Sequence, residues 1–97
     1  MLILSLPYLD PDQIRYYSNK YKSYYALIEY RLDYNRHFDS FPEELLSSRS
    51  ILTIRDPLEG GKYTADLSGK LAYYRLMIEK YDCLVDLELR NANGHNL

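Results

Sequence analysis

The sequence predicts a mainly α-helical fold in which two long amphipathic helices fold back on each other as an antiparallel helical hairpin. Three observations lead to this prediction. Apolar side chains recur every three or four residues over two long stretches, the turn residues gather between those stretches, and tyrosine supplies 12 of the 97 residues. A chain of this length forms one domain, residues 1–97, because a second core would be too small to stand alone.

The first expected helix spans residues 11–38. Asp10 is suited to cap it, and Pro11 is suited to its first position. Apolar residues follow at heptad spacing, as in a coiled-coil seam: Ile14, Tyr21 and Ile28. Residues 1–9 precede this helix as an extended, strand-like segment that ends near Pro7.

The second half of the chain is expected to hold the other long helix. Residues 42–48 predict a short helix, and residues 50–63 predict a strand or loop that contains Gly60 and Gly61. The second long helix then spans residues 64–90, before a flexible tail at residues 91–97. Its seam is the cleaner of the two: Leu71, Ile78 and Val85 alternate with Leu67, Tyr74 and Tyr81.

A minimal two-stranded β ribbon is compatible with this fold class. It would pair residues 2–6 with residues 51–55, and it would need to pack on the helices because an isolated ribbon is marginal in water. No internal repeat of the solenoid type is evident in the sequence.

Composition excludes several classes of function. The formal net charge of −2 at pH 7 argues against a polybasic nucleic-acid arm. The apolar run at residues 2–6 is too short to span a membrane and lacks the basic start of a signal peptide. Cys83 is alone, so an internal disulfide is impossible. We therefore expect a soluble, cytoplasmic protein with no membrane partner.

No motif in the sequence predicts catalysis. Gly60-Gly61-Lys62 lacks the wider glycine spacing and the following Ser or Thr of a phosphate-binding loop. Asp33 and His37 lie one helical turn apart, but two ligands do not make a metal site. Cys83 lies in an apolar sequence with no base nearby. We expect no catalytic residue, no metal and no cofactor.

The first expected helix carries a second, roughly opposite line of aromatic and basic side chains. Tyrosine and arginine are enriched at the energetic centres of protein interfaces. The sequence therefore predicts a partner-binding face formed by Tyr16, Lys20, Leu27, Tyr30, Arg31 and Tyr34.

The predicted function is a non-enzymatic protein–protein interaction module that acts by occupying the surface of another protein. Small, tyrosine-rich, motif-free chains are typical of phages and mobile elements, so an inhibitor of a host defence system of the anti-CRISPR type, or an assembly factor, fits the sequence. A homodimer through the remaining apolar face is a further expectation. The alternative is a small helical nucleic-acid-binding protein that uses the same Tyr, Arg and Lys side chains.

Overall fold

The chain folds around a parallel β-sheet. The computed structural model describes residues 2–56, 61 and 67–87. Four strands hydrogen-bond in the order β1–β2–β3–β4, and every neighbouring pair is parallel. The strands are β1 (Ile3–Pro7), β2 (Leu27–Arg31), β3 (Ser50–Thr53) and β4 (Leu84–Asp86).

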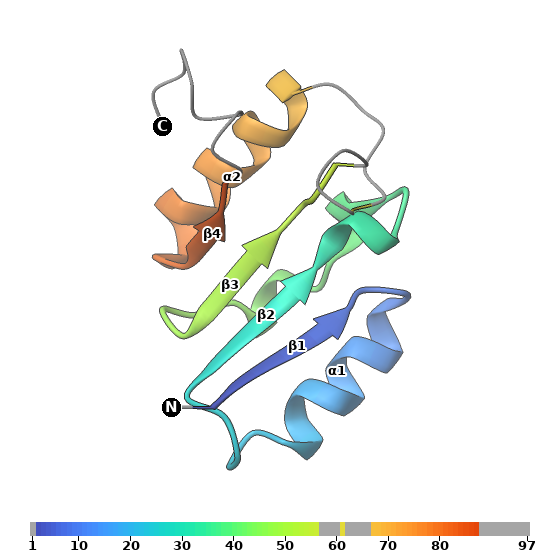
Figure 1. The fold of residues 1–97 in the computed structure, drawn as a ribbon, viewed down its shortest axis with the longest axis vertical. Helices are drawn as coiled ribbons and strands as arrows, with labels where there is room; N and C mark the ends of the chain where they lie inside the picture. Colours follow the sequence, from blue (N-terminus) through green and yellow to red (C-terminus); the bar gives the residue numbers. More distant parts are fainter. Residues whose placement is uncertain (1, 57–60, 62–66, 88–97) are drawn as a thin grey trace.

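Two α-helices and three single-turn 3₁₀ helices accompany the strands. Helix α1 (Pro11–Lys20) lies between β1 and β2 in the chain, and α2 (Leu67–Tyr81) precedes β4. The 3₁₀ turns lie between β2 and β3: η1 (Leu32–Tyr34), η2 (Phe38–Ser40) and η3 (Glu43–Leu45). Figure 1 shows the strands side by side, with α1 beyond the β1 edge and α2 near β4.

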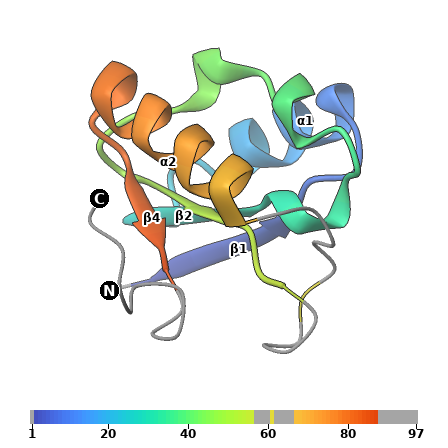
Figure 2. The same cartoon turned by 90° about the horizontal axis from the view of Figure 1, so that it is seen from above.

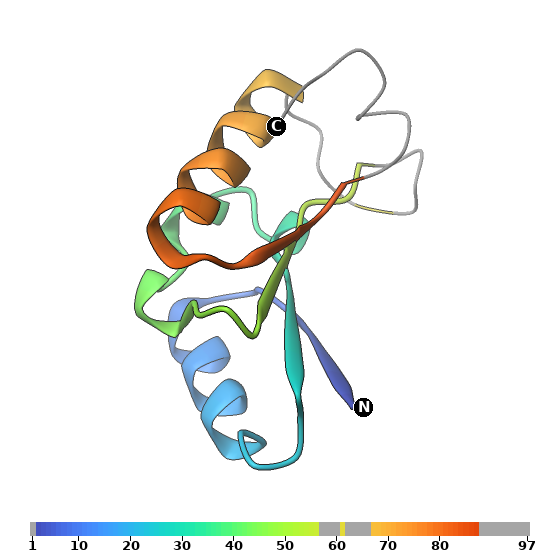
Figure 3. The ribbon, with the colours of Figure 1, turned by 90° about the vertical axis from the view of Figure 1, so that its left-hand side faces the viewer.

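Both α-helices lie on one side of the sheet. Figure 2 shows them above the strands, and Figure 3 shows them together on one side of the strands. The sheet therefore has an inner face toward the helices and an outer face away from them. Consecutive parallel strands are neighbours, and paired residues lie between 22 and 33 positions apart along the chain.

The core lies between the inner face and the helices. Strand residues that point inward are buried or partly buried, while their neighbours point to the outer face, as the two-residue period of a strand requires. The buried set includes Ile28, Tyr30 and Leu52 from the strands, Leu32 and Ile54 from the residues directly after β2 and β3, and Ile14, Tyr74 and Met77 from the helices.

The structure overturns the predicted helical hairpin. The fold is α/β with a four-stranded parallel sheet, and no element within residues 2–56, 61 and 67–87 is a long helix of the predicted length. The expected helix at residues 11–38 stops at Lys20, and the same stretch then forms β2 and η1.

The periodicity of residues 27–32 explains this error. Ile28 and Leu32 satisfy a helical spacing of four, but Ile28, Tyr30 and Leu32 also alternate with Leu27, Glu29 and Arg31. The structure follows the alternation, because β2 is paired on both sides and its inward residues are buried. The turn between α1 and β2 uses tyrosine, lysine and serine, without the glycine or proline that would have marked it.

The second predicted helix, residues 64–90, is also shorter. Helix α2 ends at Tyr81 because Asp82 takes the left-handed conformation, with φ of 57°. Asp82 donates its N–H to the carbonyl of Ile78, and β4 follows two residues later. Aspartate enters this region more readily than most residues, so it ends the helix without glycine. Residues 64–66 and 88–90 lie outside the described part of the chain, as does the expected tail at 91–97.

The proposed ribbon between residues 2–6 and 51–55 does not form, because β2 separates β1 from β3. The middle of the chain holds the 3₁₀ turn η3 where a short helix at 42–48 was expected, and β3 begins at Ser50 within the segment 50–63. Each strand and the segment that returns to the next strand form one unit, and successive units lie side by side in the sheet.

Over residues 2–56, 61 and 67–87, no helix combines the length and apolar character needed to cross a membrane.

Candidate functional site

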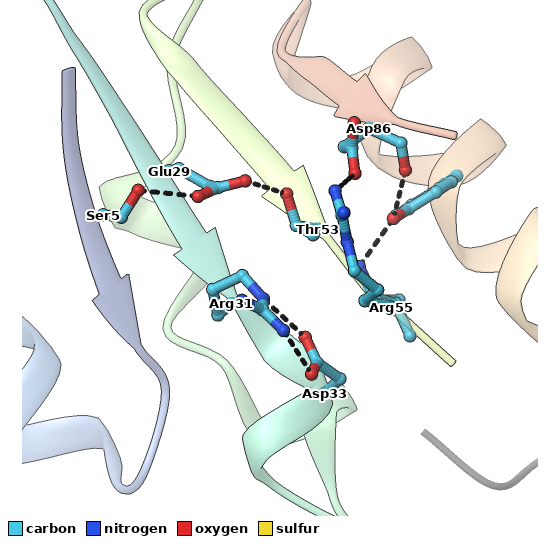
Figure 4. Close-up of polar contacts among 9 residues, drawn as sticks. Ser5, Glu29, Arg31, Asp33, Thr53, Arg55 and Asp86 are labelled. Carbon is cyan, nitrogen blue, oxygen red and sulfur yellow. Dashed lines mark hydrogen bonds and ion pairs between the residues drawn. The ribbon is translucent and has the colours of Figure 1, made fainter. Parts of the chain in front are cut away.

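The outer face of the sheet carries side chains in two registered rows. Parallel pairing aligns Ser5 of β1 with Glu29 of β2, then with Ile51 and Leu84. The next row contains Pro7, Arg31, Thr53 and Asp86. The strands therefore bring together residues that lie far apart in the sequence, and Figure 4 shows the polar members of this face.

Glu29 links three strands through its carboxylate. Its Oε1 accepts a hydrogen bond of 2.6 Å from the hydroxyl of Ser5, and its Oε2 accepts one of 2.6 Å from the hydroxyl of Thr53 (Figure 4). Thr53 is completely buried, whereas Ser5 is exposed. Both carboxylate oxygens are thus held by donors on the flanking strands, which fixes the Glu29 side chain across the middle of the sheet.

Arg31 and Asp33 form a two-pronged ion pair at the end of β2. Arg31 Nε lies 3.0 Å from Asp33 Oδ1, and Arg31 Nη2 lies 2.9 Å from Oδ2 (Figure 4). The Asp33 side chain is fully buried and that of Arg31 is 23% exposed. The hydrogen bonds to Asp33 raise the pKa of Arg31 against the opposing effect of burial. One edge of the guanidinium is thereby committed to Asp33.

A second ion pair joins the ends of β3 and β4. Arg55 Nη2 bonds Asp86 Oδ2 (Figure 4), and both side chains remain about a third exposed. Arg55 Nε is buried and has no hydrogen-bond partner. Asp86 also accepts, through its backbone carbonyl, a hydrogen bond of 2.9 Å from the hydroxyl of Tyr74 on α2.

Apolar side chains border these charges on the same face. Ile3 is 47% exposed and Leu84 is 49% exposed. Leu27 pairs with Ile3, and Ile51 pairs with Leu84, so each exposed residue has an apolar neighbour on the next strand. A surface that mixes fixed charges with exposed aliphatic groups suits a protein partner, because burial of the aliphatic groups supplies affinity and the charges supply specificity.

The six predicted partner-binding residues do not share one surface. Tyr16 and Lys20 lie exposed on α1, with Lys20 Nζ 5.6 Å from the centre of the Tyr16 ring. Leu27 and Arg31 belong to the outer face. Tyr34 in η1 lies beside Arg31, whose guanidinium carbon is 5.2 Å from the Tyr34 ring centre.

Tyr30 occupies the core instead. Its side chain is 1% exposed, and its ring meets Phe41 edge-on with the centroids 4.8 Å apart. Burial raises the pKa of Tyr30 to about 12. The face predicted on a single long helix is thus divided among α1, the core and the outer face, because β2 replaces the second half of that helix.

Most of the polar residues on the outer face were not predicted from the sequence. The sequence did not predict these five as site residues: Ser5, Glu29, Thr53, Arg55 and Asp86. One pattern would have found part of this set: the alternation in residues 27–32 places Glu29 and Arg31 together on the side opposite the apolar residues. Their neighbours on β1, β3 and β4 depend on strand order, which no local pattern specifies.

The candidate residues for other chemistry lie apart from this face. Cys83 is buried, its thiol donates to the carbonyl of Met77 at 3.6 Å, and burial raises its pKa. That environment disfavours the reactive thiolate. Asp33 is committed to Arg31, while His37 lies exposed in the segment before η2. No group of three potential metal ligands occurs among the residues placed in the structure.

Comparison with protein-family models, with curated proteins and with solved structures found no match to this chain.

Proposed function

We propose that this protein is a non-enzymatic interaction module that binds another protein through the outer face of its sheet. The observation that supports this proposal is the group of fixed charges formed by Glu29, Arg31 and the Arg55–Asp86 pair, bordered by exposed aliphatic residues. Fixed side chains lose little conformational entropy on binding, so such a face is prepared for a partner of matching shape and charge.

The stacking of the units supports the same proposal. Solenoid proteins bind partners with extended surfaces made from equivalent positions of successive units. Asn35 links two units directly, because its Nδ2 donates to the carbonyl of Leu9 at 2.9 Å.

The charges on this face disfavour the alternative of nucleic-acid binding. Arg31 and Arg55 are each paired with a carboxylate, and Glu29 adds a third negative group nearby. A phosphate backbone would meet guanidiniums whose positive charge is already balanced by those carboxylates, which weakens its attraction. We propose that the bound partner is a component of a host defence system, which this protein would inhibit, or a component of an assembly.

Affinity capture with matched variants tests this proposal. Leu84 on β4 and Leu76 on α2 are both 49% exposed, but Leu84 lies on the outer face and Leu76 on the helical side. Wild-type, Leu84→Asp and Leu76→Asp proteins would be used as bait in lysate of the cells that produce the protein. We expect a partner that is retained by wild type and Leu76→Asp and lost from Leu84→Asp.

Retention of every captured protein by Leu84→Asp would contradict the proposal, provided circular dichroism shows that all three baits fold alike. A salt-sensitive shift of DNA or RNA by the wild type, lost on Arg31→Gln, would support nucleic-acid binding instead.

A further inference from the structure

The free edge of the sheet at β1 borders an apolar groove. The groove has a volume of about 290 Å³. Leu6, Pro7 and Leu9 line one side of it, and α1 lines the other through residues that include Ile14 and Tyr17. Figure 1 shows α1 lying outside β1, beyond the last strand of the sheet. The helix therefore overhangs the edge at the place where a further strand would lie.

The hydrogen bonds of β1 show which of its backbone groups face outward. The carbonyl of Leu2 accepts from Ala26, and the N–H of Tyr8 donates to Arg31, so the even-numbered residues bond to β2. Alternate residues of a parallel strand turn their groups to opposite sides. Ile3 and Ser5 thus present an N–H and a carbonyl to the free edge, while Pro7 presents a carbonyl alone.

Residues of opposite charge lie beside the two ends of the groove, outside its lining. Helix α1 begins four residues after β1 ends and returns along it, so Asp10 lies toward the Pro7 end. Lys20 lies at the opposite end, where its Nζ is 5.4 Å from the centre of the Tyr21 ring that also lines the groove. An occupant with a carboxylate near Lys20 would complement this pattern, since Asp10 would repel such a group at the other end.

We propose that the β1 edge binds one extended segment of a partner protein, which adds to the sheet as a fifth strand. The segment carries apolar side chains at the alternate positions that enter the groove, and an acidic residue at the end near Lys20. Main-chain bonds to Ile3 and Ser5 provide affinity, and the groove provides side-chain selection, as in other strand additions. A second copy of this chain fits less well, because its own α1 would meet the overhanging helix.

Selection from a displayed library of random peptides tests this site without a known ligand. We expect wild-type protein to enrich peptides with alternating apolar residues and a terminal acidic residue. The decisive comparison uses two variants at one position. Ser5→Ala removes the bond to Glu29 but keeps the outward N–H, whereas Ser5→Pro removes that N–H as well. An enriched peptide should bind Ser5→Ala like wild type and bind Ser5→Pro roughly tenfold more weakly.

Equal binding of the enriched peptides to Ser5→Pro and Ser5→Ala would overturn the proposal, as would a failure to enrich any peptide. If Ser5→Pro does not fold, amide exchange in the wild type decides the matter. The peptide should slow exchange of the Ile3 and Ser5 amides, and unchanged exchange at both would also overturn it. Lys20→Glu should reverse the preference for an acidic end. The outer-face proposal is tested at Leu84, so either site can fail alone.

Discussion

The hydroxyl of Tyr74 on α2 lies 2.7 Å from the backbone nitrogen of Ile54 and accepts its hydrogen bond. The same hydroxyl donates to the carbonyl of Asp86, so one buried side chain joins the ends of β3 and β4. Tyr74→Phe would leave both backbone groups without this partner. We expect the free energy of unfolding, measured by denaturant titration, to fall by roughly 2 to 4 kcal/mol.

Tyr73 supplies the matched control for this experiment. Its hydroxyl is buried without a hydrogen-bond partner, and its ring packs edge-on against Phe38. Tyr73→Phe keeps the ring and removes an unsatisfied polar atom, so stability should stay the same or rise slightly. A loss as large as that of Tyr74→Phe would show that the hydroxyl bonds of Tyr74 are not the cause.

Ionisation of Tyr30 should contribute to unfolding in alkali. Burial raises the pKa of Tyr30 to about 12, from an ordinary value of 10.0. Its contribution is complete below pH 10, and it is lost as pH rises through 12, because the unfolded chain ionises first. The two-unit difference corresponds to about 2 to 3 kcal/mol. Tyr30→Phe should therefore unfold at higher pH than wild type in an alkaline titration followed by circular dichroism.

The exposed ring of Tyr16 provides the comparison for that titration. Tyr16→Phe should leave the alkaline midpoint where it is in the wild type. If Tyr30→Phe and wild type unfold at the same pH, other groups govern the transition.

Glu43 should make stability sensitive to acid. Its Oε1 accepts a hydrogen bond of 2.6 Å from the hydroxyl of Tyr81 and lies 3.3 Å from Lys80 Nζ. The hydrogen bond from Tyr81 is the main cause that holds the pKa of Glu43 below 4.5, and the hydrogen bond and charge of Lys80 lower it further. This contribution is present above pH 4.5 and disappears as pH falls through the lowered value.

Glu43→Gln should therefore be less stable than wild type at neutral pH, and the difference should shrink in acid. Thermal unfolding across an acidic pH series measures it. Glu79→Gln, an exposed change on α2, controls for the loss of a charge. A difference between wild type and Glu43→Gln that stays constant with pH would contradict the assignment.

Removal of the Arg31 side chain should destabilise the protein, because it leaves the buried Asp33 carboxylate without its guanidinium. The Asp33 carboxylate is fully buried against a guanidinium that is 23% exposed. Arg31→Ala should lower the free energy of unfolding by roughly 2 to 3 kcal/mol, below the loss for a fully buried pair because solvent reaches Arg31. The double variant Arg31→Ala/Asp33→Ala should regain part of that loss in denaturant titration. A double variant less stable than the single one would mean that Asp33 has a separate stabilising role.

Asp82 offers a stabilising change. Its φ of 57° costs a residue with a β-carbon some free energy that glycine avoids. Asp82→Gly should raise the free energy of unfolding by about 0.5 kcal/mol, after allowing for the greater freedom of glycine in the unfolded chain. The melting temperature should rise slightly as a result. Asp82→Ala keeps the β-carbon and should bring no gain. An equal rise in both variants would point to the lost charge instead.

Local patterns predicted part of this fold. The sequence predicted Asp10 as the cap of α1, and this prediction is confirmed: Asp10 Oδ1 accepts a hydrogen bond of 2.9 Å from the N–H of Gln13. The ends of the helices did not follow, because Tyr21 and Asp82 end α1 and α2 without glycine or proline. β2 was misassigned because the positions of Ile28 and Leu32 satisfy both periods, and only pairing with β1 and β3 selects the strand.

The candidate site was less predictable than the elements. Arg31 was predicted to lie on a helix, whereas it lies at the end of β2 and pairs there with Asp33. Glu29 meets Ser5 and Thr53, each 24 positions away in the chain, and such contacts depend on the order of strands in the sheet. Tyrosine content alone did not predict that Tyr8 and Tyr74 are completely buried with their hydroxyls hydrogen-bonded.

Pro7 has a consequence for how this protein behaves at high concentration. A long, regular sheet edge invites copy after copy to stack into fibres. Here the row of outward donors stops after Ser5, since Pro7 has no N–H to offer. The edge can accept a short strand while it interrupts indefinite growth. Replacement of this proline by valine would extend the row of donors and favour aggregation.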